Sequence, residues 1–493
     1  MALPKVFGVE TEYGIIVKGD ERLNPVAAST LVVSSYRDLL SKSAEWDFDD
    51  EHPERDARGF VMPPDKAPTV EPSLTNVVLP NGARLYVDHA HPEYSTPECS
   101  DPLELVAHDA AGVLVMRKAV ARLEATMDDG QTLRLYKNNS DGKGNSYGCH
   151  ENYLVSRDVP FEDLAEKLVP YFVSRQVICG AGKVGAENGT EEAHFQISQR
   201  ADFFEELIGL ETTIRRPIIN TRDEPHADPS LYRRLHVIVG DANMSQFANF
   251  VKIGATALVI LMIEDGFIQK DLSLDDPVSA LRAVSRDLTC RRPLRRSDGT
   301  TITPVELQWN YYELAEKWRE GHDHPAWTPR VLDAWRQALE GLESDPFSLS
   351  DRLDWVAKLR VIESYRESRG LDWKDSKVAM IDLQYHDIRE DRGIYWKLEQ
   401  SGAIKRMVGD ETIKGAELNP PETTRAYFRG RAIQHFGRAI VSANWDSVVV
   451  DSGKATLKRI PMMNPHKGTK SAVGQLFQQA SDAEHLIELL SEG

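Results

Sequence analysis

The sequence predicts an α+β protein in which a large domain, residues 1–419, is followed by a small C-terminal α/β domain, residues 420–493. Strand-like segments rich in Val, Ile and aromatic residues occur in the first 155 residues and again at 234–239. Helical spacing of apolar residues covers much of the rest. The pair Pro420-Pro421 breaks the chain, and a shorter helix–strand–helix pattern follows it.

The strands are predicted first at residues 6–17 (VFGVETEYGIIV) and, after the turn pair Asn81-Gly82, in ARLYVDHAHPEY. Shorter strands are predicted at 133–136, at 153–155 and at 234–239 (RLHVIV). Between the first two strands, residues 45–56 carry seven acids and one Arg, and six prolines lie between positions 53 and 80. This composition predicts a long, mobile, acidic loop over about 42–78, either functional or disordered.

Helices are predicted where apolar residues recur with helical spacing. In the large domain the predicted ranges are 102–126, 161–175, 246–265 and 304–368. In the small domain we expect a helix at 425–441, a strand at 447–450 and a final helix at 473–491. The apolar segment 246–265 is explained by a packed core, because its longest apolar run is much shorter than the roughly 20 residues of a membrane helix.

Charge and cysteine content restrict the class of protein. The 59 basic and 77 acidic residues give a formal net charge of −18, which disfavours binding to nucleic acid or to an anionic membrane over the whole surface. The four cysteines are widely scattered, without a C-x-x-C pair. With no secretory signal recognised at the N-terminus, reduced thiols in the cytoplasm are expected.

Ionisable side chains share one face of two predicted strands. Because side chains alternate along a strand, Glu10 and Glu12 lie on one face of GVETEYG. By the same rule Arg84, Tyr86 and Asp88 share a face of RLYVD. This pattern fits a sheet with a solvated outer face and equally fits a functional site.

A cation would reconcile several carboxylates on neighbouring strands, and Mg²⁺ prefers such oxygen ligands and bridges to nucleotide phosphates. Glu93 and Glu98 would add oxygens, and His236 is either an imidazole ligand or a hydrogen-bonded core histidine. The arginines that could meet phosphate oxygens are Arg84, Arg222 and Arg234, although each taken alone also fits an ion pair. No P-loop motif is present.

Longer blocks of the sequence resemble one family. They are, in order, GVETEYG, NGARLYVDHAHPEYSTPE, YKNNSDGKGNSYGCHENYL, VSRQVICGAGKVG, INTRDEPHADPSLYRRLHVIVGDANMS, DLQYHDI and PPETTRAYFRG. They are similar to the family of the Pup ligase and the Pup deamidase/depupylase, which is related to glutamine synthetase among the carboxylate–amine ligases. The resemblance implies a glutamine synthetase-like, curved antiparallel β-sheet that cradles the site and is backed by helices.

The resemblance also implies roles for individual residues. Glu10, Tyr86 and Glu93 match the Mg²⁺ ligands of the family, Arg84, Thr96 and Trp445 match its ATP contacts, and Asp88 matches its catalytic aspartate. The aromatic face of Trp445 would then stack on adenine. Strand geometry and charge add Glu12 and His236 as metal ligands and Arg222 as a cofactor contact.

Two features resemble the depupylase branch more than the ligase branch. One is the long insert that contains ERDARGF, and the other is D-H-A-H-P-E, which is one residue shorter than the ligase pattern D-V-G-S-H-P-E. The expected activity is hydrolysis of the isopeptide bond between Pup and substrate lysines, and deamidation of the C-terminal Gln of Pup, with Mg·ATP as cofactor. The alternatives are the Pup–protein ligase reaction and a catalytically inactive scaffold.

The expected partners are Pup and pupylated proteins, with a connection to the proteasome pathway. Because Pup is itself acidic, an acidic enzyme needs a local basic surface to bind it. Residues 281–296 hold six arginines, and Arg215-Arg216, Arg233-Arg234 and residues 425–431 add more. We expect some of these to line a positive groove that leads to Asp88.

Overall fold

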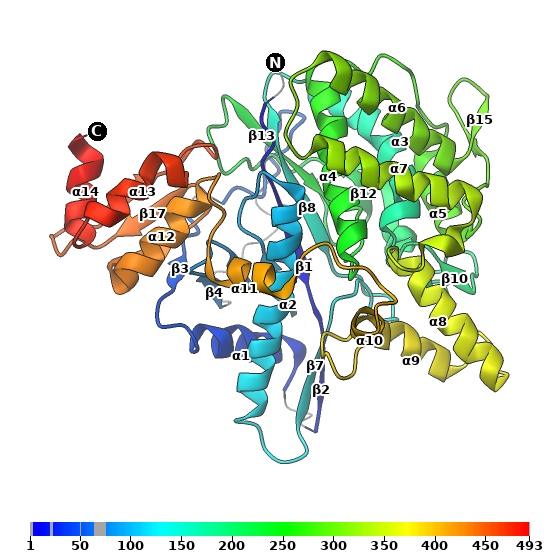
Figure 1. Ribbon diagram of the computed structural model, residues 1–493, viewed down its shortest axis with the longest axis horizontal. Coiled ribbons are helices and arrows are strands. Elements are labelled where there is room, and N and C mark those ends of the chain that lie inside the picture. The colour runs from blue at the N-terminus through cyan, green and yellow to red at the C-terminus, as the bar shows by residue number, and fades with distance from the viewer. Residues whose placement is uncertain (1–2, 20–22, 50, 64–74, 493) are drawn as a thin grey trace.

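A ten-stranded sheet organises the computed structural model, which describes residues 3–19, 23–49, 51–63 and 75–492 (Figure 1). Every neighbouring pair of its strands is antiparallel except β3–β16, which is parallel. In spatial order the strands are β13 (Tyr232–Val237), β8 (Cys149–Ser156), β1 (Phe7–Glu12), β6 (His91–Ser95), β5 (Arg84–Asp88), β4 (Asn76–Val78), β3 (Ala44–Trp46), β16 (Ile440–Ala443), β17 (Ser447–Val450) and β18 (Lys458–Pro461).

The predicted strand at 6–17 is two strands that belong to different sheets. β1 lies in the main sheet, whereas β2 (Gly14–Lys18) pairs with β7 (Thr132–Tyr136). The chain changes sheet next to Gly14, where a Cβ atom would overlap the Tyr147 hydroxyl. Glycine is therefore required at this crossing.

Further two-stranded pairings lie around the main sheet. They are β9 (Lys183–Val184) with β10 (Phe195–Gln196), β11 (Phe204–Gly209) with β12 (Arg216–Asn220), and β14 (Leu294–Arg295) with β15 (Thr301–Ile302). The β11–β12 pair is parallel. None of these six strands was predicted from the sequence, because each is short and lacks sustained alternation.

The predicted helices in the large domain are present: α2 (Pro102–Glu124), α3 (Phe161–Cys179), α4 (Gln246–Glu264), α6 (Pro304–Gly321), α7 (Thr328–Ser344) and α8 (Asp354–Arg369). Helix α2 begins where Asp101 accepts a hydrogen bond from Leu103 N and Pro102 opens the first turn. Helices not predicted are α1 (Pro25–Arg37), α5 (Pro277–Arg286), α9 (Ser376–Tyr385), α10 (Ile394–Gln400) and α11 (Asp410–Leu418).

Helix α4 forms the centre of the largest core. Among the described residues, it is the helix that is long and apolar enough to cross a membrane, yet the whole apolar window is buried inside the protein. It packs on α2, α3, α6 and α7, which Figure 1 shows beside it on one side of the sheet. The prediction that residues 246–265 form a buried core helix is confirmed.

The acidic insert differs from the predicted loop at both of its ends. Ala44–Trp46 and Asn76–Val78 are strands β3 and β4, which lie inside the sheet between β5 and β16. Their pairing with the neighbouring strands outweighs the acidic and proline-rich composition around them. Residues 50 and 64–74 of the predicted loop lie outside the described residues.

The C-terminal residues add three strands to the edge of the same sheet and cover them with α12 (Ala426–Phe436), α13 (Lys470–Gln479) and α14 (Ala483–Glu492), at the left of Figure 1. The predicted helix 473–491 is in fact divided between α13 and α14, because Ala480 is extended. These elements share a cluster of buried side chains with Ala44, Trp46 and Val78. A separate small domain at 420–493 stays a prediction.

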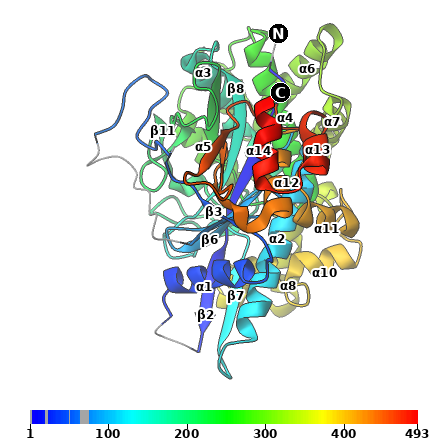
Figure 2. The same cartoon turned by 90° about the vertical axis from the view of Figure 1, so that its left-hand side faces the viewer.

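Figure 2 gives the same arrangement from the side of the C-terminal helices, with the sheet behind them and α1 and α2 below. The curved antiparallel sheet backed by helices, which the family resemblance implies, is confirmed in this structure. One of its faces packs on the helices, and the other carries the polar side chains described next.

Candidate functional site

The polar face of the sheet is assembled by strand register. Glu10 on β1 lies opposite His150 on β8 and Ser95 on β6. Glu12 lies opposite Glu93, which in turn lies opposite Tyr86 on β5. Since residues directly opposite each other share a face, side chains from four neighbouring strands meet on this face in two adjacent rows.

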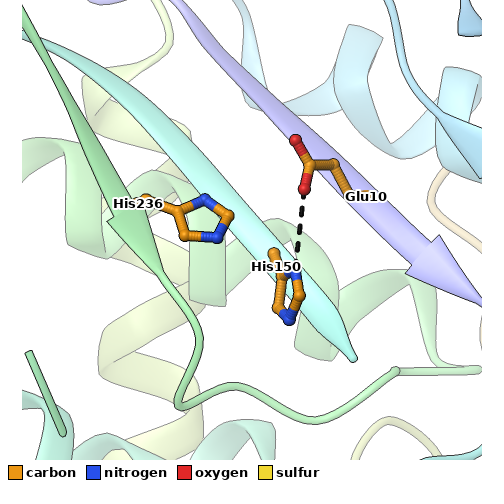
Figure 3. A group of neighbouring side chains, drawn as sticks. All are labelled: Glu10, His150 and His236. Atoms are coloured by element: carbon orange, nitrogen blue, oxygen red, sulfur yellow. Dashed lines mark ion pairs between the residues drawn. The ribbon is translucent and has the colours of Figure 1, made fainter. Parts of the chain in front are cut away.

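The first group of possible metal ligands is Glu10, His150 and His236, whose ligand atoms lie within 4.8 Å of one another (Figure 3). His150 Nδ1 is 3.5 Å from Glu10 Oε2, and Arg234 Nη1 is 3.8 Å from Glu10 Oε1. Burial would raise the pKa of Glu10, but the hydrogen bond with His150 and the Arg234 charge outweigh it, so the pKa lies below its usual value. Glu10 is therefore an anion facing two imidazoles.

Asn152 fixes the orientation of this group. Its amide nitrogen donates to Glu10 Oε1 at 2.9 Å, so its oxygen is left to accept from His236 Nδ1, also at 2.9 Å. His236 must then carry its hydrogen on Nδ1, and Nε2 keeps a free lone pair. Burial, together with the Arg234 charge, lowers the pKa of His236 well below its usual value. A neutral imidazole of this kind is a ready metal ligand.

The second group is Glu12, Asp88 and Glu93, whose oxygens also lie within 4.8 Å of one another. Burial raises the pKa of Glu93 well above its usual value, and the negative charges of Asp88 and Glu12 add to the rise. Glu93 is 1% exposed, and its Oε1 atom has no hydrogen-bond partner within the described part of the chain. Three crowded carboxylates and an unsatisfied buried oxygen fit a hard divalent cation.

Tyr86 lies at the centre of this acidic environment. Its pKa is raised well above the usual value by burial and by the charges of Glu93 and Glu10, so it is a neutral phenol here. Its hydroxyl accepts a long hydrogen bond from Ser95 Oγ at 3.4 Å. The same phenol ring lies against the guanidinium of Arg84. Tyr86 thus connects the carboxylates to the predicted phosphate-binding arginine.

Asp88 closes strand β5 at a two-residue turn, since it lies opposite His91 in the β5–β6 hairpin. The first turn residue, His89, has φ 50°, a left-handed conformation that is uncommon for residues other than glycine. His89 Nδ1 is 3.1 Å from Asp88 Oδ1. Burial opposes ionisation of Asp88, but the His89 contact outweighs it and lowers the pKa below its usual value. Asp88 is therefore held as a carboxylate.

Asp88 opens into a pocket, here called the Asp88 pocket, that is rich in basic side chains. Arg200 is buried and bonds to Ser146 Oγ and Ile238 O, and Arg216 bonds to Ser146 O at 2.9 Å. Arg215 is exposed at the rim and makes no ion pair with any residue the structure describes. The ionisable residues that line the pocket are Glu12, Asp88, His89, His91, His150, Arg200, Glu205, Arg215 and Arg216.

A second pocket, here called the Trp445 pocket, lies on the other side of Glu10. It contains Thr96 and Trp445, the two predicted ATP contacts, together with Arg234 and Arg425. The Thr96 hydroxyl accepts a hydrogen bond from Val9 N at 3.1 Å, so this side chain is fixed against β1. Two of the predicted cofactor contacts therefore lie in a pocket that the predicted metal ligand Glu10 also lines.

Glu98 does not belong to the metal cluster. Its carboxylate pairs with Arg425 at 2.8 Å and with Arg429, and Arg429 also donates to Trp445 O at 3.0 Å. Burial alone would raise the pKa of Glu98, but the two guanidinium groups lower it to about 2. The suggestion that Glu98 adds a metal oxygen is wrong, because both its oxygens are already held by arginines.

Arg222 lies beside the same row, after β12. Its backbone donates to Asn220 Oδ1, and its buried Nε atom has no hydrogen-bond partner in the described chain. Burial raises the pKa of Glu51, and the Arg222 charge opposes part of that rise. The same charge adds to the lowering of the pKa of Asp88, after the larger effect of His89. Arg222 has no ion-pair partner among the residues that the structure describes, and such a cation fits an anionic ligand.

Sequence reasoning missed three residues of the site, which are His150, Asn152 and Trp46, and it named Arg425 only as part of a basic cluster. The predicted strand 153–155 begins at Cys149 instead, and starting it there would have placed His150 and Asn152 on the face that carries Glu10. Trp46 was missed because it lies in the segment 42–78, which the sequence predicted to be a loop. The arginines of 281–296 do not line the Asp88 pocket: Arg286, for example, pairs with Asp202, and Arg282 donates to Phe204 O.

Comparison with known proteins agrees with this arrangement. The family model described as Pup-ligase protein matches residues 5–449. A depupylase of Acidothermus cellulolyticus is 50% identical over 99% of both chains. A Pup deamidase/depupylase of Mycolicibacterium smegmatis is 45% identical over 99% of this chain and 100% of its own. A Pup–protein ligase of Acidimicrobium ferrooxidans is 42% identical over 87% of this chain and 89% of its own.

Solved structures of the same family are similar in fold. The crystal structure of Pup in complex with its ligase PafA has a TM-score of 0.81 at 35% identity and covers 99% of this chain and 95% of the other. The structure of the Pup ligase PafA in complex with ADP has a TM-score of 0.74 at 40% identity, over 82% of this chain and 89% of the other. The curved sheet, the carboxylate cluster and these matches all agree: the chain belongs to the Pup-ligase family.

Proposed function

We propose that this chain is a depupylase and Pup deamidase. It hydrolyses the isopeptide bond between the C-terminal Glu side chain of Pup and a substrate lysine, and it removes the amide from a C-terminal Gln of Pup. The observation that carries the proposal is the position of Asp88, a carboxylate that joins the Glu12–Glu93 cluster and also opens into a basic pocket. The full-length relatives at 45–50% identity, which are named for this activity, support it.

The cofactor of the proposed enzyme is Mg·ATP. Glu10, Glu12, Tyr86, Glu93 and His236, with the additional residue His150, would hold magnesium, and the unsatisfied Glu93 oxygen supports this set. Arg84, Arg222, Thr96 and Trp445 would hold the nucleotide, and the ADP complex of a related ligase supports nucleotide binding in this family. When bound, the metal supplies positive charge that stabilises a developing oxyanion.

Asp88 acts on the amide carbonyl in one of two ways. It attacks the carbonyl carbon and forms an anhydride that water then opens, or it takes a proton from the attacking water. Either route breaks the C–N bond, sends a proton to the leaving amine and adds the elements of one water. Because no phosphoryl group is transferred, ATP need not be consumed in each turnover. The lowered pKa of Asp88 keeps the side chain as the carboxylate that either role requires.

The ligase reaction is the second candidate, because ligase relatives reach 42% identity. In that reaction ATP phosphorylates the terminal glutamate of Pup, and Asp88 deprotonates the incoming lysine. The two-residue turn after Asp88 favours the depupylase, since the ligase pattern has one residue more at this place.

The four cysteines are all free and buried, which supports a reducing compartment such as the cytoplasm.

One experiment separates the candidates. The protein is incubated with Mg·ATP and a purified Pup–substrate conjugate, and in parallel with Pup ending in Glu plus a lysine-containing acceptor. Release of free Pup from the conjugate supports the proposal. New conjugates without release would show that the ligase reading is correct, and no reaction in either tube would favour a scaffold.

A further inference from the structure

The guanidinium of Arg84 is held between two aromatic rings. Its central carbon lies 3.8 Å from the ring centre of Trp46 and 4.0 Å from that of Tyr86. Both distances are well inside the range of an effective cation–π contact. The charged head of this arginine is therefore fixed in a flat slot, although it belongs to one of the most flexible side chains.

Strand register builds this slot. Ala44 on β3 lies opposite Val78 on β4, and Val78 lies opposite Arg84 on β5. Since alternate residues of a strand share a face, Trp46 is on the same face as Ala44, and Tyr86 is on the same face as Arg84. Two strands that flank β4 therefore supply the two walls of the slot.

Trp46 is itself firmly placed. It is 5% exposed, and its indole Nε1 donates to Glu51 Oε1 at 2.6 Å. Its ring meets the ring of Trp445 edge to face, with 5.3 Å between the ring centres. The backbone of β3 pairs with β16, which places Trp46 beside Ala443. Trp46 thus connects the predicted adenine-stacking residue to the predicted phosphate-binding arginine.

The edge of the guanidinium is only partly occupied. Arg84 Nε donates to Asn76 Oδ1 at 2.7 Å, which fixes rotation about the end of the side chain. The nearest carboxylate, Glu51, is 3.6 Å from Arg84 Nη2, beyond hydrogen-bond distance. The terminal N–H groups that point away from Asn76 are those that can meet phosphate oxygens in a bidentate manner.

We propose that Trp46 and Asn76 are positioning residues for the nucleotide: they hold the Arg84 guanidinium flat between Trp46 and Tyr86 and turn its terminal N–H groups towards the nucleotide phosphates. Neither residue was assigned to the site by the sequence or by the family resemblance. The inference rests on the proposed function, because it requires that Arg84 bind a nucleotide. Pre-ordering the arginine reduces the entropy lost when the phosphates bind.

The test measures the dissociation constant of Mg·ATP by calorimetry for the full-length protein and for Trp46→Leu, Trp46→Phe and Asn76→Ala. Trp46→Leu is expected to weaken binding about tenfold, and Asn76→Ala about threefold to tenfold. Trp46→Phe keeps an aromatic face but loses the Glu51 hydrogen bond, so it is expected to stay within about threefold of the wild type. Trp396→Leu is the matched control, because it removes an arginine–tryptophan stack of 4.1 Å, with Arg117, far from the nucleotide residues.

A second step tests whether both residues act through Arg84. The same substitutions are made in an Arg84→Met background, where the guanidinium is absent. Trp46→Leu and Asn76→Ala should then change the dissociation constant less than twofold. An unchanged affinity in the single variants, or an undiminished loss in the Arg84→Met background, would overturn the proposal. Failure of the wild type to bind Mg·ATP at all would instead overturn the proposed function.

Discussion

The side-chain oxygen of Asn152 lies 2.9 Å from Nδ1 of His236, and this contact determines which nitrogen of the histidine can bind a metal. Since the Asn152 amide nitrogen donates to Glu10, the oxygen can only accept, and His236 Nε2 keeps its lone pair. Asn152 thus sets the tautomer of a histidine that we propose as a metal ligand.

Replacing Asn152 by Ala is expected to weaken metal binding by about 10- to 100-fold, because His236 and Glu10 lose the residue that orients them. The affinity is measured with Mn²⁺ as a paramagnetic substitute, in the presence of ATP. Asn145→Ala is the control, since Asn145 is exposed and bonds only within its own loop, to Asp141. An Asn152→Ala protein that binds Mn²⁺ as tightly as the control would contradict the assigned role.

Replacing Glu93 by Gln is expected to have opposite effects on the metal-free and the metal-bound protein. Without metal, the repulsion between Glu93 and its neighbours Asp88 and Glu12 disappears, so the melting temperature should equal or exceed that of the wild type. With Mg·ATP at about 100 times its dissociation constant, the wild type should gain about 2.7 kcal/mol of stability. The variant should gain less than half of that.

Melting curves in EDTA and in Mg·ATP check both parts of this prediction. Glu206→Gln, a change outside both ligand groups, provides the comparison. If the variant were destabilised in EDTA and still gained the full stabilisation from Mg·ATP, Glu93 would be a structural residue and not a ligand.

The Glu98–Arg425–Arg429 cluster is expected to stabilise the attachment of the C-terminal elements. Removing the buried negative charge by Glu98→Gln should cost about 3–5 kcal/mol of unfolding free energy, because two guanidinium groups lose their partner. The exposed pair Lys470–Glu422 supplies the control, and Glu422→Gln should change the stability by less than about 0.5 kcal/mol.

The same cluster predicts a pH dependence. The pKa of Glu98 falls from a usual value of 4.5 to about 2 in the folded protein. A group with a lowered folded pKa stabilises fully above its unfolded pKa, so this contribution is complete above about pH 5 and is lost as the pH falls towards 2. Denaturant unfolding between pH 6 and pH 3 should show a smaller loss for Glu98→Gln than for the wild type. Parallel curves for the two proteins would refute this.

Binding to Pup is expected to depend on salt, because the rim of the Asp88 pocket is basic although the chain carries a net charge of −18. Arg215→Glu should weaken binding about fivefold at low salt, since Arg215 is exposed at the rim with no ion pair inside the described structure. Arg291→Glu is the matched control: Arg291 is also exposed, and its side chain bonds to Glu343 O away from the pocket. Equal effects of the two reversals, or binding insensitive to salt, would contradict the prediction.

Local patterns were sufficient to predict the parts of the site that lie on β1 and β5. Alternation placed Glu10 with Glu12 and Arg84 with Tyr86 and Asp88, and the register of β1, β5 and β6 brings these faces together. Alternation could not reveal that the metal candidates divide into two groups around Glu10 and Glu93, because that depends on which strands are neighbours. Which strands become neighbours depends on contacts between distant parts of the chain, and local sequence does not show these contacts.

In the segment 42–78, too, local sequence did not reveal which strands pair. Its acids and prolines predicted a loop, yet β3 and β4 lie in the middle of the sheet, between β5 and β16. Trp46 and Asn76, at the ends of these strands, both contact Arg84. A deletion of 45–75 is therefore expected to disrupt the fold, because it would remove Trp46 and most of β3.

The central claim is that Asp88 carries out hydrolysis of the Pup isopeptide bond beside the Glu12–Glu93 cluster. The most direct test compares the release of Pup from a conjugate by the wild type and by Asp88→Asn, each saturated with Mg·ATP, with the dissociation constant of Mg·ATP measured on the same samples. The account predicts that cleavage falls by at least about 10³-fold while nucleotide affinity changes less than about threefold. Cleavage by Asp88→Asn at a rate near that of the wild type would contradict it.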